Sequence, residues 1–166
     1  MSSPIIDVFT VFGAVPPRTT EQGTAKLVAS MDRHGVHSAL TLSTRGIYHS
    51  ANAGNRETLA NCNQSGGKLM GIATLDPRTT ALPEIDGFIA LAAFPVAQHW
   101  PMYHAAFLGM LATLAQQGIT LPLILEASRI GDLSQFRGNL HASGYKGAVI
   151  AQGVTSESIS EIIALA

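Results

Sequence analysis

The sequence predicts an α/β fold built from parallel strand–helix repeats, and three observations support this class. Apolar runs of strand length alternate with amphipathic helical segments along all 166 residues. Charged residues make up only 13% of the chain, which is typical of a parallel sheet buried on both faces or of a surface partly covered by a partner. Four predicted helices end at a glycine just before the next strand: Gly35, Gly67, Gly118 and Gly144.

The predicted elements follow a simple order, and strands alternating with helices imply parallel pairing through right-handed crossovers. Strands are expected at residues 5–12, 37–43, 69–75, 87–94, 121–127 and 146–151. Helices are expected to begin near Thr19, Asn55, Pro101 and Asp132, and a last one covers residues 155–166. Thr19 with Gln22 fits a capping box, and residues 79–84 are expected to form a turn or a single helical turn.

Composition excludes several classes of protein. The net charge is −1 and no long basic run is present, so nothing indicates a nucleic-acid partner. Cys62 is the single cysteine, which leaves no intrachain disulfide framework. No apolar stretch is long enough to span a bilayer, and the N-terminus lacks a basic leader pattern. We therefore expect one cytoplasmic domain over residues 1–166 with no membrane partner.

The first predicted strand carries the most specific pattern in the chain. It reads IIDVFTVFG from Ile5 and resembles the first strand of the amidohydrolase superfamily, especially the branch of decarboxylases and lactone hydrolases. That strand reads Asp-x-His-x-His-x-Gly, and here Phe9 and Val11 stand at the two histidine positions. Four residues fit the pattern: Asp7, Thr10, Phe12 and Gly13.

Three further segments resemble the same superfamily: LVASMDRHGVHSALTLS from Leu27, LMGIATLDP from Leu69 and LPLILEAS from Leu121. The resemblance implies a (βα) barrel fold. A complete barrel needs roughly 250 residues, so we expect an incomplete barrel of about six strands.

The two substitutions in the motif affect the metal chemistry that the resemblance implies. In the superfamily the two strand-one histidines hold a divalent metal that activates water or polarises a carboxylate. Phe9 and Val11 offer no lone pair and make the site apolar, which raises the cost of placing a dication there. The superfamily's sixth-strand histidine has no counterpart either. We therefore expect no metal and no cofactor.

Weak catalytic candidates remain at the expected ends of strands. Glu126 aligns with the usual fifth-strand histidine, and His49 and His99 lie in loops after the second and fourth strands. An alternative interpretation of Glu126 is a structural carboxylate paired with Arg129, Arg78 or a loop amide, since lone acids in apolar strands must be paired. His49 and His99 are more often ordinary polar loop residues than catalytic ones.

A small-molecule pocket is a further hypothesis, because polar residues gather at the expected carboxyl ends of the strands. Asp76 within Asp76-Pro77 is also typical of a turn and cap. Cys62 has no evident activating neighbour and is not expected to act as a nucleophile. The proposed pocket residues are Thr10, Ser43, Asp76 and Arg129.

Six parallel strands leave the first and last strands as edges, whose unpaired backbone groups invite another chain. The chain is then expected to self-associate, to be completed by a complementary barrel subunit, or to be a piece of a longer protein. The leading functional hypothesis is a non-catalytic scaffold or regulatory subunit of an oligomer. The alternatives are a metal-independent hydrolase or lyase acting on a small carboxylic or lactone substrate, and a module that binds a small organic acid.

Overall fold

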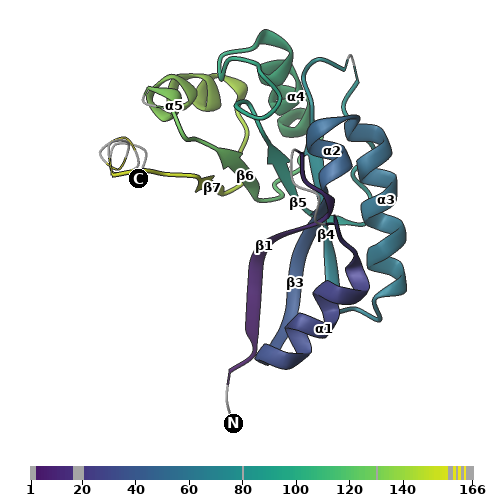
Figure 1. Cartoon of the computed structure of the whole chain (residues 1–166). Coiled ribbons are helices and arrows are strands. Elements are labelled where there is room, and N and C mark those ends of the chain that lie inside the picture. Colours follow the sequence, from purple (N-terminus) through teal and green to yellow (C-terminus); the bar gives the residue numbers. More distant parts are fainter. Residues whose placement is uncertain are drawn as a thin grey trace. The chain divides into compact units, whose positions relative to one another are not determined.

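The computed structural model divides the chain into two compact units (Figure 1). The first unit comprises Met1–Thr74 and Pro83–Ala90, and the second comprises Leu75–Leu82 and Leu91–Ala166. The structure describes residues 3–16, 21–79, 81–129, 131–156, 159, 161 and 163.

The first unit is a parallel sheet with helices on one side of β1 and β3 (Figure 1). β1 pairs in parallel with β3, and β3 in parallel with β4, whereas the two residues of β2 pair antiparallel with Gly13 and Ala14. The strands are β1 (Ile5–Ala14), β2 (Glu21–Gln22), β3 (Val36–Ser43) and β4 (Leu69–Leu75). The helices are α1 (Thr24–His34), α2 (Thr44–Tyr48) and α3 (Ala51–Gln64).

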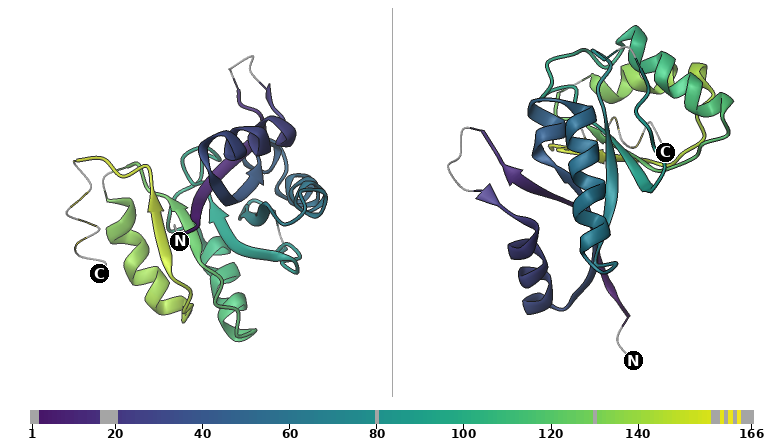
Figure 2. Two further views of the ribbon diagram at one scale, coloured as in Figure 1. Left: turned by 90° about the horizontal axis from the view of Figure 1, so that it is seen from below. Right: turned by 90° about the vertical axis from the view of Figure 1, so that its right-hand side faces the viewer.

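The second unit repeats the same plan. β5 pairs in parallel with β6, and β6 in parallel with β7. Helices α4 and α5 pack against each other in this unit (Figure 2). The strands are β5 (Phe88–Ala93), which begins in the first unit, β6 (Leu123–Glu126) and β7 (Val149–Gln152), and the helices are α4 (Ala105–Gln116) and α5 (Asp132–Ser143).

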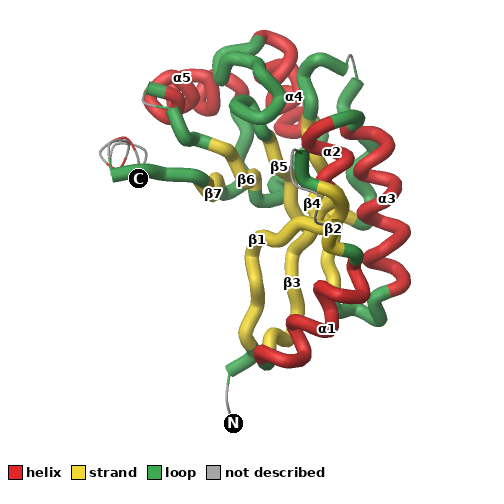
Figure 3. The backbone as a smooth tube through the Cα atoms, in the orientation of Figure 1, coloured by secondary structure: helices red, strands yellow, loops and turns green. Residues whose placement is uncertain are grey.

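The predicted α/β class with parallel βα repeats is confirmed, as the alternation of helix and strand in Figure 3 shows. The prediction that glycines end the helices is confirmed for α1 and α5, whereas the C-caps of α3 and α4 are Ser65 and Gln117. Gly35 and Gly144 are the C-caps of α1 and α5 in left-handed conformation. Gly67 and Gly118, at the two other predicted helix ends, also have positive φ angles, which glycine adopts without steric cost.

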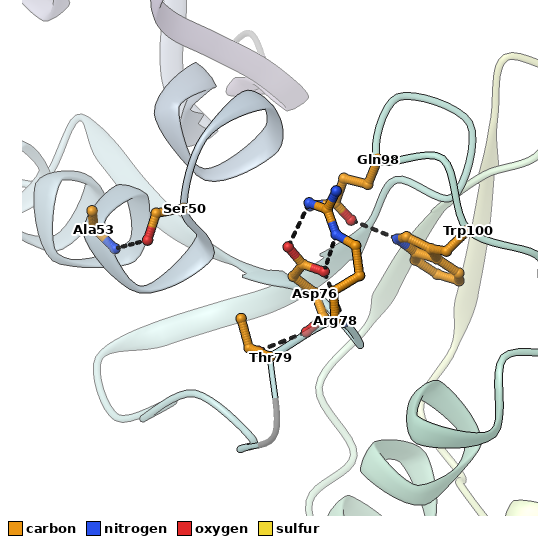
Figure 4. Close-up of polar contacts among 7 residues, drawn as sticks. All are labelled: Ser50, Ala53, Asp76, Arg78, Thr79, Gln98 and Trp100. Carbon is orange, nitrogen blue, oxygen red and sulfur yellow. Dashed lines mark hydrogen bonds and ion pairs between the residues drawn. The ribbon is translucent and has the colours of Figure 1, made fainter.

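Several predicted helix starts are wrong. Gln22 lies in β2, and α1 begins after Gly23 without a side-chain cap; Thr19 lies outside the described residues. α3 begins at Ala51 because the Ser50 hydroxyl accepts a hydrogen bond from the Ala53 amide at 3.3 Å, as Figure 4 shows.

Two further elements begin later in the chain than predicted. α4 begins only at Ala105, since Pro101 lies in turns that precede the N-cap residue His104. The last predicted strand begins at Val149 rather than at residue 146. Within the described part of residues 79–84, no helical turn forms.

Each unit has an apolar core under its helices. In the first unit, Leu27 and Met31 of α1 pack with Ala39 of β3 and Leu69 of β4. The second core contains some of the largest fully buried side chains of the molecule, which belong to β5, β6, α4 and α5: Leu91, Leu123, Ile124, Phe107, Leu111, Leu114 and Phe136.

Two isoleucines of the segment predicted as the last helix are exposed. Ile159 is 57% exposed and Ile163 is 74% exposed, while Ile162 lies outside the described residues. None of the described helices is long and apolar enough to cross a membrane.

Candidate functional site

The best candidate site lies where the strands of the second unit end, because catalytic and binding loops of (βα) folds follow the carboxyl ends of strands. The loop after β5 is tightly folded by its own backbone. The Gln98 amide donates to the Phe94 carbonyl at 2.9 Å, and the Trp100 amide donates to the Pro95 carbonyl at 3.0 Å. His99, between them, is exposed and is the one described non-glycine residue with positive φ, at 58°.

Glu126 ends β6 and holds this loop. Its Oε2 atom accepts hydrogen bonds from two consecutive backbone amides, Val96 at 2.9 Å and Ala97 at 3.0 Å. Two successive amides aimed at one anion form a small anion-binding nest, and the chain fills it with its own carboxylate. Of the partners that the sequence left open for Glu126, loop amides are the ones observed.

Asp76 follows β4 and is bound by Arg78 in a fork (Figure 4). Arg78 Nε donates to Oδ1 at 2.8 Å and Nη2 to Oδ2 at 2.7 Å, while the Arg78 amide also donates to Oδ1 at 3.0 Å. Burial raises the pKa of the Asp76 carboxyl, but the Arg78 hydrogen bonds and charge, with a charge contribution from His104, outweigh burial and hold the pKa below its ordinary value. Asp76 is therefore an ionised carboxylate whose two oxygens are engaged.

Gln98 and Trp100 form a buried polar pair in the same loop. The Trp100 indole Nε1 donates to Gln98 Oε1 at 2.9 Å (Figure 4), and the two residues are only 1% and 2% exposed. The loop after β5 is consequently a packed structure rather than an open mouth. Sequence reasoning missed this pair, because neither residue stands in a recognisable motif.

Arg129 lies one turn beyond β6 and is exposed. Its Nη2 atom donates to the Pro95 carbonyl at 3.5 Å, and its amide donates to Asp132 Oδ2 at 3.3 Å. Burial raises the pKa of Asp132 above its ordinary value, and the nearby Glu161 adds to the rise, against the lowering effect of Arg129. Arg129 therefore links the β5 loop to the start of α5.

The remaining proposed residues belong to the first unit. The Ser43 hydroxyl caps α2 by accepting from the Arg45 amide at 3.1 Å, and it donates to Glu57 Oε2 at 2.9 Å. His49 is exposed at the C-terminal end of α2. Thr10 is half-buried on β1, in register with Thr41 of β3. These groups serve local caps and pairings of the first unit.

The two residues that replace the expected histidines lie on β1. The pairing of β1 with β3 shifts register between Asp7 and Thr10, so Phe9 lies within an irregular step of the strand. Its amide donates to Asp7 Oδ1 at 3.0 Å. Among the described residues, no three His, Cys, Asp or Glu side chains come together as a metal site would require.

Cys62 also shows no sign of activation. The thiol lies half-buried on α3, and burial raises its pKa to about 11. A thiol with a raised pKa is a poor nucleophile at neutral pH. Taken together, Asp76, Glu126 and Asp132 are held by hydrogen bonds from arginine or backbone groups, and no hydrogen bond joins any of the three to a histidine among the described residues.

No model of a known protein family matches this chain, and no curated protein matches it.

Proposed function

We propose that this protein is a self-associating, non-catalytic subunit that descends from an amidohydrolase-like (βα) barrel. One observation carries the proposal: the outer edge of β1 is apolar and open. Ile5, Ile6 and Val8 are 56%, 50% and 56% exposed. Among the described strands, only the two residues of β2 pair with β1 on the side away from β3, and they do so at Gly13 and Ala14.

A second copy of the chain is the occupant that suits this edge. Strand edges normally carry lysine or another charge that discourages pairing, and residues 5–12 contain a single charge, Asp7. Two β1 strands related by a two-fold axis can pair antiparallel with the same residues on each side. A register centred on any residue other than Asp7 keeps the two carboxylates from lying opposite each other.

Three features support the rest of the proposal. Glu126 and Asp76, which are the acids at the carboxyl ends of the strands, are engaged by loop amides and by Arg78. The βα order agrees with the proposed descent, although fold alone does not determine activity. The glycine of the first-strand motif is also required by its backbone, because Gly13 has a φ of 102° and a Cβ there would lie 2.5 Å from Thr44 Oγ1.

Sedimentation equilibrium tests the proposal directly. We expect the wild-type protein at micromolar concentration to have twice the 17.4 kDa mass of the chain. Ile6→Lys should shift the protein to monomer without unfolding it, since Ile6 is 50% exposed and its replacement leaves no buried cavity.

Ile89→Lys is the matched control. Ile89 is 40% exposed but lies on β5, which pairs with β6, so this variant should keep the wild-type mass. A wild-type protein that is monomeric at 100 times the concentration used for the variants, or an Ile6→Lys variant that remains dimeric, contradicts the proposal.

A further inference from the structure

In the second unit, the acidic side chains have partners within the unit, whereas two of the basic side chains form no ion pair among the described residues. Each described carboxylate of this unit accepts a hydrogen bond from the same unit. Asp76 is bound by Arg78, Glu126 by two loop amides and Asp132 by the Arg129 amide. Glu161 accepts from the amides of the first turn of α5, including Leu133 at 3.1 Å and Ser134 at 3.3 Å.

The basic side chains of this unit differ in whether they have an ion-pair or hydrogen-bond partner. The second unit contains four lysine and arginine residues. Arg78 is bound to Asp76, and Arg129 donates to a backbone carbonyl. In the part of the chain that the structure describes, no carboxylate forms an ion pair with the other two, Arg137 and Lys146.

These two cations line the same hollow, together with His141. The hollow has a volume of about 570 Å³ and lies at the C-terminal end of α5, with Leu140, Tyr145 and two glycines completing its wall. Arg137 and His141 are four residues apart on α5 and so face the same side of the helix. Lys146 follows the left-handed cap Gly144, which turns the chain back toward β7.

The wall of the hollow is held in place by a buried tyrosine. Tyr145 is 5% exposed, and its hydroxyl donates to the Leu121 carbonyl. Burial raises the pKa of Tyr145 to about 12, so the phenol stays neutral and adds no negative charge. The neighbouring Gly147 leaves room for this phenol, since a Cβ at residue 147 would lie 2.5 Å from the Tyr145 hydroxyl oxygen.

The helix end alone does not balance these charges. The C-terminus of a helix carries the equivalent of roughly half a negative charge, whereas Arg137 and Lys146 bring two positive charges, and His141 adds a ring nitrogen donor. A hollow of this size is within the usual range for small-ligand sites. Arg137, His141 and Lys146 are all exposed, so an anion from outside the chain can reach the three side chains.

We propose that this hollow binds the phosphate group of a small phosphorylated molecule through Arg137, His141 and Lys146. Three separate donors suit a phosphate monoester, which presents three terminal oxygens, better than a carboxylate, which presents two. Leu140 and the Tyr145 ring offer an apolar wall for the rest of the ligand. The site is separate from the β1 edge and does not depend on self-association.

Amide NMR titration of the ¹⁵N-labelled protein in low-salt, phosphate-free buffer tests the site. Three probes are compared: phenyl phosphate, inorganic phosphate and benzoate. Phenyl phosphate should shift the amide signals of Gly138, Gly144 and Lys146 with a saturable curve. Benzoate has the same ring but only two acceptor oxygens, so it should bind at least about tenfold more weakly.

A pair of double variants separates local recognition from net charge. Arg137→Gln with Lys146→Gln should weaken phenyl phosphate binding at least about tenfold, because two charge-assisted hydrogen bonds are lost. Lys26→Gln with Arg33→Gln removes the same charge from exposed positions of α1 and should change binding by less than about twofold.

Inorganic phosphate that binds as tightly as phenyl phosphate still supports the site and assigns recognition to the phosphate group alone. Benzoate binding equal to that of phenyl phosphate overturns the choice of phosphate. An equal loss in both double variants overturns a local site, and an absence of saturable shifts overturns the proposal as a whole.

Discussion

The two units of this protein share one βα plan but pack their helices by different means. In the first unit, α2 and α3 approach so closely that glycine backbones touch, and side-chain amides and hydroxyls bind the sheet. In the second unit, large aromatic side chains fill the space between the helices and the β5 loop. The same architecture can therefore be stabilised by close backbone contact with polar hydrogen bonds, or by the packing of large apolar side chains.

The close contact in the first unit depends on Gly46 of α2 and Gly54 of α3. A Cβ at Gly54 would overlap the backbone N and Cα atoms of Gly46. At the next residue, the Asn55 side chain both accepts from the Thr74 amide at 2.8 Å and donates to the Thr74 carbonyl at 3.1 Å. Thr58 adds a hydroxyl that accepts from the Ser43 amide at 2.9 Å. These contacts leave no room for added side-chain volume.

The second unit is stabilised by a row of three packed aromatic rings, which belong to Trp100, Phe107 and Phe136. Trp100 and Phe107 have ring centroids 4.9 Å apart, and Phe107 and Phe136 have centroids 6.1 Å apart at 28°. Both phenylalanines are fully buried. Such pairs contribute beyond the area that they bury. The first unit should therefore be sensitive to added volume and the second to lost volume.

The largest effect is expected from removing the central ring of the second unit. Phe107→Ala should lower the free energy of unfolding by about 3–5 kcal/mol, because it leaves a cavity between Trp100 and Phe136. Urea denaturation followed by far-UV circular dichroism measures the change. Fluorescence of Trp100, the single tryptophan, reports the second unit separately.

Tyr103→Ala is the control for this substitution. Tyr103 precedes α4 and is 61% exposed, so removal of its ring should change stability by less than about 0.5 kcal/mol. If Tyr103→Ala and Phe107→Ala lowered the free energy of unfolding equally, the row of buried aromatic rings would have no special role in the second unit.

The second-largest change in stability is expected in the first unit, from the addition of a single methyl group. Gly54→Ala should lower the free energy of unfolding by about 2 kcal/mol, since α2 must move away from α3 to avoid overlap. Gly109→Ala, in the exposed middle of α4 with no atom near its Cβ position, should instead raise stability by roughly 0.5–1 kcal/mol. Urea denaturation of both variants checks the signs, and a Gly54→Ala protein as stable as wild type contradicts the close-contact view.

The fold class was predictable because it depends on patterns that persist over many residues. Alternating apolar runs and helix-ending glycines specify parallel βα repeats wherever the helices are long. Short elements carry no such pattern: β2 is two residues that pair only with Gly13 and Ala14, and α2 is five residues with a glycine inside. The start of α4 was also hidden, because turns formed by the Gln98–His104 backbone precede it.

The candidate site was only partly predictable, for a related reason. The sequence places polar residues at the ends of strands, and Asp76, Glu126 and Arg129 do lie there. Their partners are a neighbouring arginine, loop amides and a carbonyl, and backbone groups carry no sequence signal. The phosphate hollow was missed because Arg137, His141 and Lys146 do not form a motif; only the i, i+4 spacing of the first two hints at a shared face.

The smallest expected effect concerns two acids of the second unit whose pKa values move in opposite directions. The folded pKa of Asp76 is lowered, so its stabilising contribution is present above the unfolded pKa of about 3.9 and is lost as pH falls through the folded value. The folded pKa of Asp132 is raised, chiefly by burial, so the ionised Asp132 carboxylate destabilises the fold at neutral pH and this effect disappears as pH falls.

Asp76→Asn should lower the free energy of unfolding by about 1 kcal/mol at pH 7, a modest loss because its partner Arg78 is 48% exposed. Asp132→Asn should be neutral or gain a few tenths of a kcal/mol at pH 7. Urea denaturation between pH 3 and pH 7 should show both differences shrinking toward acid pH, about the range of the unfolded carboxyl pKa. Parallel pH profiles for the two variants would mean that both carboxylates have the same environment, contrary to the Arg78 fork at one and the burial beside Glu161 at the other.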